Sequence, residues 1–342
     1  MKALIYSSKG KIELTEKPKP KLLSKKDAIV KVSVSSICTS DLHIINGFVP
    51  KAKEGVVLGH EFVGVVDEIG EEVKNVSVGD RVSVNCETFC GECYFCKKGF
   101  INNCEKGGWF LGCQIDGCQA EYVRVPFADC GLNKLPCNVS DLNALFVGDI
   151  LSSGNFGALM CDIKEGDSIA VIGAGPVGMC SMICAKIMGA KKIIAIDINE
   201  KRLEIAKSKG ICTHVFNPLK SDIEKEIKNL TEGRGADGVI EAAGAKETFE
   251  MSWKIARPNG IVGVVAMYEE NQILPLPSMY GKNLTFKTGG VDAVHCGELI
   301  NLISSGKINT DFLITHKFKL ENIIEAYEVF KKGNCLKIAV EG

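Results

Sequence analysis

The sequence lacks the features that point to a membrane or a nucleic acid as partner. No run of about 18 apolar residues occurs, the length that a membrane-spanning helix needs. The 41 Lys and Arg residues balance 42 Asp and Glu residues to a net charge of -1, without a long basic block. Because nucleic-acid binders usually carry a clustered basic face, we expect neither a membrane nor a nucleic acid as partner.

A secretory signal is also missing from the start of the sequence. Met1-Lys2-Ala3-Leu4 leads into strand-like sequence, without a basic segment followed by an apolar core. We therefore expect a cytoplasmic protein whose 16 cysteines stay reduced. Several of them have the spacing of metal ligands, and others, such as Cys180 and Cys184, lie in an apolar segment where cysteine behaves as a small hydrophobic residue.

The length of 342 residues exceeds what one hydrophobic core usually serves, so two domains are expected. Residues 1–148 are β-rich, with candidate strands at 28–34, 62–69 and 81–84. From residue 149 onward strand and helix patterns alternate, which predicts an α/β unit with a parallel sheet. Its candidate strands lie at residues 167–172, 193–196, 215–216, 238–240, 260–265 and 284–286.

Residues 37–61 contain the first group with metal chemistry. Cys38 and His60 offer a thiolate and an imidazole, both good zinc ligands, and Ser40 places a hydroxyl two residues after the cysteine. Asp41 and Glu61 are carboxylates that can orient this neighbourhood. Since a catalytic zinc needs three protein ligands and one open position, a third ligand is expected elsewhere in the chain.

A second metal-ligand pattern consists of four cysteines in one loop. Cys90, Cys93 and Cys96 follow each other at a spacing of three, and Cys104 comes shortly after. Four thiolates fill the tetrahedral coordination of zinc and leave no open position, so this pattern predicts a structural zinc site. Cys86 breaks the spacing and is interpreted as a wall residue of a nearby pocket.

A glycine-rich turn follows the candidate strand at residues 167–172 and opens a helix. Gly173 permits a tight turn, Gly175 lets the backbone approach a pyrophosphate, and Gly178 lets helix and strand pack closely. The free N–H groups at the helix start favour a phosphate. The predicted dinucleotide-binding residues of this turn are Gly173, Gly175, Pro176, Val177 and Gly178.

The next strand ends in Asp197, where a carboxylate is expected to bind the adenosine ribose hydroxyls. A negative charge at this point repels a 2′-phosphate and favours NAD over NADP. Arg202 is the opposing observation, because a nearby arginine can accommodate that phosphate. NAD is therefore the expected cofactor, with NADP as the alternative.

These motifs together resemble the zinc-dependent medium-chain alcohol dehydrogenase family, across essentially the whole chain. They are Gly59-His60-Glu61 with Gly64 and Gly70, Gly79-Asp80-Arg81-Val82, the loop from Cys90 to Cys104, and residues 173–178. The resemblance implies a GroES-like β-rich catalytic domain at residues 1–148 and a Rossmann domain with a doubly wound parallel sheet at 149–288. Residues 289–342 are then expected to return to the catalytic domain.

The resemblance also implies the ligands of a catalytic zinc. Cys38 and His60 match two family ligands, and Glu61 matches an adjacent carboxylate that can ligate transiently. The third ligand lies where the catalytic domain meets the Rossmann domain, and this chain has Asp149 there instead of a cysteine. In this respect it is similar to bacterial secondary-alcohol dehydrogenases, which typically use NADP and lack the four-cysteine loop.

A mechanism follows from that resemblance. Zinc lowers the pKa of the bound alcohol, and hydride passes from the carbinol carbon to the nicotinamide. The alcohol proton is expected to leave through Ser40 and the nicotinamide ribose to His43, and Ser153 is expected near the nicotinamide. The alternative for His43 is a loop histidine without a catalytic role.

Cys86 and Trp109 match positions that line the substrate channel in the family, and residues 46–48 can form its mouth. A small side chain at Cys86 leaves room for branching at the carbinol carbon. Secondary alcohols, diols and polyols, or their ketones, are therefore the expected substrates, with primary alcohols and aldehydes second.

Other readings of the chain remain open. They are a threonine-type dehydrogenase, a non-enzymatic dinucleotide-binding relative, and a zinc-ribbon nucleic-acid binder. The presence of Cys38, His60 and Asp149 opposes the second, and the net charge of -1 opposes the third. We also expect a homodimer or homotetramer, from the resemblance and from the apolar residues 261–267 near an expected sheet edge.

Overall fold

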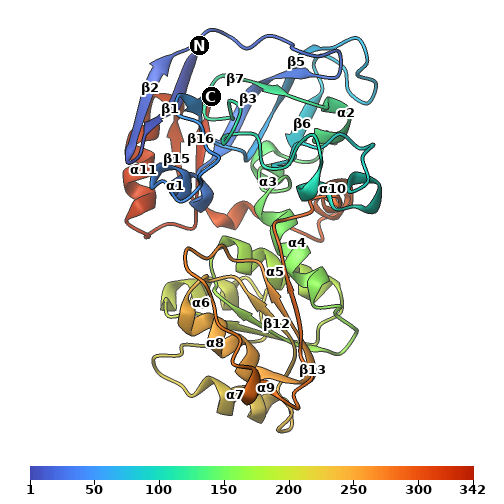
Figure 1. The fold of residues 1–342 in the computed structure, drawn as a ribbon, viewed down its shortest axis with the longest axis vertical. Coiled ribbons are helices and arrows are strands. Elements are labelled where there is room, and N and C mark those ends of the chain that lie inside the picture. Colours follow the sequence, from blue (N-terminus) through green and yellow to red (C-terminus); the bar gives the residue numbers. More distant parts are fainter. The chain divides into compact units, whose positions relative to one another are not determined.

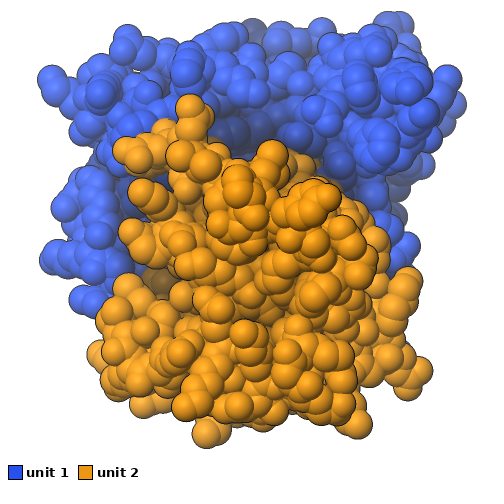
Figure 2. Space-filling view, turned by 60° about the horizontal axis from the view of Figure 1, so that its bottom comes forward, with its two compact units in different colours: residues 1–152, 292–342 blue, residues 153–291 orange.

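A computed structural model describes every residue from Met1 to Gly342, and the chain divides into two compact units (Figure 2). Unit 1 comprises Met1–Ser152 and Asp292–Gly342, so two separate stretches of sequence build it. Unit 2 is the continuous stretch Ser153–Val291. The division falls within helix α4 (Ile150–Met160), a few residues after the expected boundary at 148. The first residues of α4 belong to unit 1 and the later ones belong to unit 2, so the boundary lies inside the helix.

Unit 1 is organised around β3, which pairs with three other strands. Its larger sheet has seven strands in the order β15-β16-β3-β5-β6-β8, with β7 also paired to β3, and a smaller sheet has the order β2-β1-β4. The strands are β1 (Lys2–Ser8), β2 (Lys11–Glu16), β3 (Ala28–Ser36), β4 (Val56–Val57), β5 (Phe62–Ile69), β6 (Arg81–Val84), β7 (Tyr122–Val125), β8 (Leu132–Lys134), β15 (Ile314–Lys319) and β16 (Lys337–Glu341). The helices are α1 (Thr39–Ile45), η1 (Cys96–Lys98), η2 (Ile101–Asn103), α2 (Ala128–Gly131), α3 (Asp141–Ala144), α10 (Cys296–Ser304), η3 (Asp311–Leu313), η4 (Leu320–Asn322) and α11 (Ile323–Lys331).

The two ends of the sequence lie side by side in unit 1. Strand β16 pairs antiparallel with β3, with Ala339 opposite Ser36, and α11 lies beside β2 and β16 (Figure 1). Residues Asp292–Gly342 thus belong to the same unit as Met1–Ser152, and β3 leads directly into the segment of Cys38.

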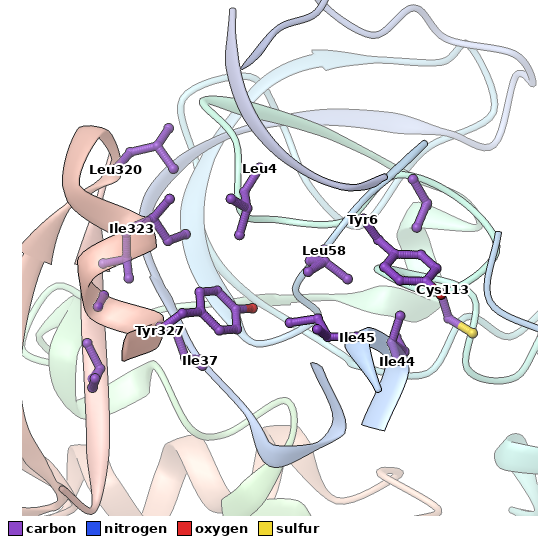
Figure 3. Packing of buried hydrophobic residues seen from close by; sticks show 14 of the residues in the cluster. Leu4, Tyr6, Ile37, Ile44, Ile45, Leu58, Cys113, Leu320, Ile323 and Tyr327 are labelled. Carbon is purple, nitrogen blue, oxygen red and sulfur yellow. The ribbon is translucent and has the colours of Figure 1, made fainter. Parts of the chain in front are cut away.

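A buried cluster joins these distant segments behind that segment. Leu4 comes from β1, Ile37 follows β3, and Leu58 follows β4, and all three are fully buried. Tyr327 extends from α11 into the same cluster (Figure 3). Since a fully buried aromatic or aliphatic side chain contributes roughly 1.5–3 kcal/mol, the cluster holds the ends of the chain against the site described below.

Unit 2 contains a six-stranded parallel sheet in the order β11-β10-β9-β12-β13-β14. The five residues of β9 are all buried, as expected for a strand covered on both faces. The strands are β9 (Ser168–Ile172), β10 (Lys192–Ile196), β11 (His214–Phe216), β12 (Ala236–Glu241), β13 (Ala256–Val264) and β14 (Thr285–Thr288). The helices besides α4 are α5 (Pro176–Ile187), α6 (Glu200–Ser208), α7 (Ile223–Leu230), α8 (Lys246–Ile255) and α9 (Leu276–Met279).

The apolar residues 261–267 do not form a sheet edge. Strand β13 is paired on both sides, by β12 and by β14, so β14 and β11 are the edge strands. For residues 261–264 the expectation of pairing with another chain therefore loses its structural basis, because their backbone groups are already hydrogen-bonded within the sheet. No helix of the chain combines the length and the apolar character needed to cross a membrane.

The close packing between β9 and α5 depends on Gly178, and Gly297 in α10 provides a comparison at an uncrowded helix position. A Cβ at Gly178 would lie 1.8 Å from the carbonyl oxygen of Gly173, whereas a Cβ at Gly297 in α10 meets nothing within 4 Å. We expect Gly178→Ala to lower the free energy of unfolding by about 1–3 kcal/mol, because the turn must shift. Gly297→Ala should raise it by about 0.5–1 kcal/mol, because alanine favours the helix. Urea unfolding followed by circular dichroism measures both, and an undisturbed Gly178→Ala variant would contradict the packing argument.

Candidate active site

Three potential metal ligands converge in unit 1. Cys38 precedes α1, His60 lies between β4 and β5, and Asp149 precedes α4. The sulfur of Cys38, a ring nitrogen of His60 and a carboxylate oxygen of Asp149 all lie within 4.8 Å of one another. His60 and Asp149 are buried and Cys38 is half-buried, so the structure brings together the three residues that the sequence analysis selected.

The arrangement of these three side chains fits a zinc ion. Asp149 Oδ2 is buried without a hydrogen-bond partner, although His60 Nε2 lies 3.4 Å away. Burial by itself lowers the pKa of His60, but Asp149 and Cys38 raise this pKa well above its usual value. The site therefore favours a positive charge at this point, and one sulfur, one nitrogen and one oxygen are donors that zinc accepts.

A hydrogen-bond chain fixes the position of Asp41 behind His60. Asp41 Oδ2 accepts bonds from the Cys38 N–H at 2.9 Å and from Gln119 Nε2 at 3.2 Å. The Tyr327 hydroxyl donates to Gln119 Oε1 at 2.8 Å, and Asp41 Oδ1 lies 3.6 Å from His60 Nδ1. A carboxylate behind a histidine fixes the orientation of the imidazole ring, and here distant parts of unit 1 supply its supports.

Glu61 forms a buried ion pair with Lys337 from β16. Both side chains are almost inaccessible, and Lys337 Nζ donates to Glu61 Oε2 and to the Ile37 carbonyl at 3.2 Å. Glu61 Oε1 accepts from the Ile150 N–H at 3.4 Å, next to Asp149. Burial lowers the pKa of Lys337, but the charges of Glu61, Cys38 and Asp149 together raise this pKa above its usual value, so the ammonium group remains charged. Glu61 is therefore held by these partners and is not one of the three converging side chains.

Ser40 and His43 both belong to α1. Ser40 Oγ lies 3.6 Å from Cys38 Sγ. His43 follows three residues later, on the same face of the helix, and packs edge-on against Phe48 at 6.3 Å between ring centroids. Both side chains are half-buried.

Cys86 and Trp109 flank the three converging side chains. The Cys86 N–H donates to the Gly148 carbonyl at 3.0 Å, beside Asp149, and Cys86 is only 3% exposed. The Trp109 ring packs edge-on against the His60 ring, with centroids 5.6 Å apart. Both positions expected to line a substrate pocket thus lie next to the candidate metal centre.

The four-cysteine loop forms a second group of sulfurs. The Sγ atoms of Cys90, Cys93, Cys96 and Cys104 lie within 4.8 Å of one another, and none is in a disulfide. Cys104 Sγ accepts N–H bonds from Cys90 at 3.3 Å and from Lys106 at 3.4 Å. Such bonds stabilise a thiolate, and four thiolates at this separation fit a zinc ion without an open coordination position.

In unit 2 the glycine-rich turn connects β9 to α5. Gly173 has a φ of 97°, which favours glycine, and α5 begins with Pro176 after the N-cap Gly175. Asp197 Oδ2 accepts the Ala174 N–H at 2.7 Å, and Asp197 Oδ1 accepts the Asn199 N–H at 2.8 Å. The carboxylate at the end of β10 therefore lies against the turn, where a dinucleotide fingerprint requires it.

Arg202 from α6 lies over the same turn. A Cβ at Gly175 would be 3.8 Å from Arg202 Nη1, and Arg202 Nε is buried without a hydrogen-bond partner. A positive and a negative side chain thus both border the turn, and the geometry is compatible with either nicotinamide cofactor. Val177 is in the first turn of α5, and Ser153 is half-buried in α4 within unit 2.

Sequence reasoning missed four residues around the site, namely Gln119, Tyr327, Lys337 and Glu87. Lys337 carried a usable signal, because it is the one charged residue between the apolar residues 335–336 and 338–340. A charge in such a strand is expected to have a buried partner. Gln119 and Tyr327 carried no such signal, since only the packing of α11 brings them together.

Comparisons with known proteins place this geometry in a family context. Residues 24–136 match the model of the alcohol dehydrogenase GroES-like domain, and residues 176–297 match that of the zinc-binding dehydrogenases. An alcohol dehydrogenase from Cupriavidus necator is 35% identical, over 100% of this chain and 98% of its own length.

Two solved structures are similar over the whole chain. Zinc-dependent alcohol dehydrogenase 2 from Streptococcus pneumonia is 39% identical with a TM-score of 0.93, covering 100% of this chain and 98% of that one. Alcohol dehydrogenase TADH from Thermus sp. ATN1 is 35% identical with a TM-score of 0.93, covering 100% and 99%. These likenesses agree with the expected pairing of a GroES-like and a Rossmann domain.

The four-cysteine loop generates a prediction on metal content. Cys104→Ser should reduce the zinc content from about two ions to about one per chain and lower the free energy of unfolding by roughly 3 kcal/mol or more. Cys137→Ser, at an exposed cysteine outside both groups, is the matched control and should change neither quantity. Elemental analysis and thermal unfolding measure both effects, and full zinc content in Cys104→Ser would exclude the loop as a metal site.

Proposed function

This chain belongs to the zinc-dependent medium-chain alcohol dehydrogenase family, and we propose that it transfers hydride between NAD(H) and a secondary alcohol or its ketone, diols and polyols included. The observation that carries the proposal is the convergence of Cys38, His60 and Asp149 within 4.8 Å in the unit that matches the GroES-like domain model. A catalytic zinc requires three protein ligands and one coordination position that stays open to water or substrate.

In this proposal Cys38, His60 and Asp149 hold the catalytic zinc. Zinc bound there supplies Lewis acidity that lowers the pKa of an alcohol hydroxyl. Ser40 Oγ accepts the alcohol proton while its own hydroxyl proton leaves toward His43, one turn further along α1, which passes a proton on toward solvent. Asp41 keeps His60 oriented, and Lys337 holds Glu61 in its position beside Asp149.

The proposed cofactor site lies in unit 2. The N-terminal end of α5 offers N–H groups to the pyrophosphate, and Asp197 accepts hydrogen bonds from the adenosine ribose. We propose NAD rather than NADP because the Asp197 carboxylate would repel a 2′-phosphate, and Arg202 then contacts the pyrophosphate side of the turn. Ser153 is proposed to contact the nicotinamide.

The choice of a secondary alcohol rests on the two flanking side chains. Cys86 has a short side chain beside Gly148, which leaves space for a second substituent on the carbinol carbon. Trp109 covers the other side of His60 with a large apolar surface. The four-cysteine loop, closed by a second zinc, fixes the backbone between these two residues.

From the family resemblance, we also expect a homodimer or homotetramer.

The third ligand is tested by paired variants of Asp149. Asp149→Ala should lose about one zinc per chain and lower kcat/KM for 2-butanol about 100-fold or more, because a zinc site with two protein ligands binds metal weakly. Asp149→Cys supplies a thiolate and should keep the zinc and measurable activity. Zinc analysis and steady-state kinetics are the measurements, and unchanged zinc content in Asp149→Ala would refute the ligand assignment.

The same assay with a panel of alcohols and ketones tests the substrate class. Faster oxidation of 1-butanol than of 2-butanol would reject the secondary-alcohol assignment in favour of primary alcohols. Absence of activity with every alcohol and both cofactors, in protein shown to contain zinc, would reject the proposed reaction.

Asp197 is tested by its effect on cofactor choice. Asp197→Gly should lower the ratio of kcat/KM for NADH to that for NADPH by about tenfold or more, because the charge that repels a 2′-phosphate is removed. Asp162→Gly is a matched control, since Asp162 has a φ of 48° that glycine tolerates and a side chain that is 56% exposed. An equal loss with both cofactors would assign Asp197 to the support of the turn alone.

A further inference from the structure

Glu87 is a buried carboxyl group that the proposed mechanism does not use. Its exposed fraction is 6%, and its Oε2 atom has no hydrogen-bond partner. Burial raises the pKa of Glu87 to about 8, which shows how strongly the carboxyl is removed from water. A buried oxygen without a partner lowers stability unless a water molecule or a ligand pairs with it.

Glu87 lies between two segments that both lead to the candidate metal centre. On one side, the N–H of its neighbour Cys86 donates a hydrogen bond to the carbonyl of Gly148, the residue before Asp149. On the other side, Thr88 and Gly108 exchange backbone hydrogen bonds of 3.0 and 2.7 Å, and Gly108 precedes Trp109.

The carboxyl group itself is turned toward that second segment. A Cβ at Gly108 would lie 3.9 Å from Glu87 Oε2, so this oxygen lies over the backbone next to the tryptophan that packs on His60. The charges that act on Glu87 come from His60, Asp149, Lys51 and Asp292, and none forms an ion pair with it. His60 and Asp149 are thus within electrostatic range of the carboxyl group, and its buried Oε2 lacks a partner from the protein itself.

A second buried polar atom without a hydrogen-bond partner belongs to Trp109, the residue after Gly108. Trp109 Nε1 is buried and has no hydrogen-bond acceptor. Glu87 thus offers an acceptor and Trp109 offers a donor, both in segments that border His60. A hydroxyl group is the ligand that suits such a pair, because one oxygen can donate one hydrogen bond and accept another.

We propose that Glu87 determines substrate specificity by accepting a hydrogen bond at Oε2 from a second hydroxyl group, adjacent to the one that is oxidised. The preferred substrates are then vicinal diols or polyols rather than simple secondary alcohols. This inference rests on the proposed function, since it needs the oxidised hydroxyl to be bound at Cys38, His60 and Asp149. A simple alcohol leaves the buried oxygen without a partner, and a site built around such a bond discriminates against ligands that lack it.

An ammonium group is the competing ligand chemistry, because a carboxylate can also bind a cation. Lys51 is among the charges that act on Glu87, and zinc at the three converging ligands would add more positive charge nearby. Both would repel a substrate ammonium group. The hydroxyl is therefore the better match.

The experiment compares 2,3-butanediol, 2-butanol and 3-amino-2-butanol with the zinc-loaded full-length protein. In the wild type, kcat/KM for the diol should exceed that for 2-butanol by about tenfold or more. Glu87→Ala should lower the diol value by about tenfold while 2-butanol changes less than about threefold. Glu87→Gln keeps an acceptor oxygen at the same chain length and should recover most of the diol preference. Glu72→Ala, at an exposed carboxylate of unit 1, is the matched control and should leave both values unchanged.

Several outcomes would overturn the inference. These are equal efficiency of the wild type with the diol and 2-butanol, an equal loss of both activities in Glu87→Ala, or a preference for the amino alcohol that depends on Glu87. If Glu87→Ala fails to fold, the wild-type ratio and the Glu87→Gln variant still decide. Oxidation of 2-butanol without a diol preference refutes the role of Glu87 alone, whereas no oxidation of any alcohol refutes the proposed function itself.

Discussion

The buried ion pair between Glu61 and Lys337 is the contact on which the candidate active site depends. It joins residues 276 positions apart, and it ties β16 to the segment that carries His60. Removing one partner of such a pair leaves an uncompensated buried charge, which costs about 3–5 kcal/mol. The same lysine also binds the carbonyl of Ile37, the residue before Cys38. One ammonium group therefore fixes the segments of two of the three converging side chains.

The sequence predicted much of the fold where a local pattern coincides with a buried face. Strands β5 and β6 have the same bounds as the expected strands at 62–69 and 81–84, because β5 ends before Gly70 and β6 begins after the Gly79-Asp80 turn. Strand β13 was expected to begin at Gly260, but it starts at Ala256, with an irregularity opposite β12. The pairing with β12 passes from Ala256 directly to Ile261, and Asn259 has a φ of 55°, so the turn preference of residues 258–260 is expressed as a bulge within the strand.

The candidate site was predictable to the extent that its residues belong to continuous motifs. Cys38, His60 and the four-cysteine loop have spacings with chemical meaning, and Asp149 entered through the family resemblance. Gln119, Tyr327 and Glu87 could not be found in this way, because their roles come from contacts between distant segments. Partnerless buried atoms, such as Glu87 Oε2, are visible only once every neighbour is placed. The supports of a site are thus harder to predict than its ligands.

The division of unit 1 into two stretches has a consequence for biosynthesis. Unit 2 is translated between them, so residues 153–291 leave the ribosome before β16 exists. A continuous unit of this kind can fold during translation, while the β-rich unit waits for its last strand. Until then Glu61 lacks its partner Lys337, and the nascent chain carries unit 2 attached to a β-rich unit without its last strand. Before β16 is made, the part of β3 that pairs with it, Val34–Ser36, is an unpaired strand edge to which a chaperone can bind.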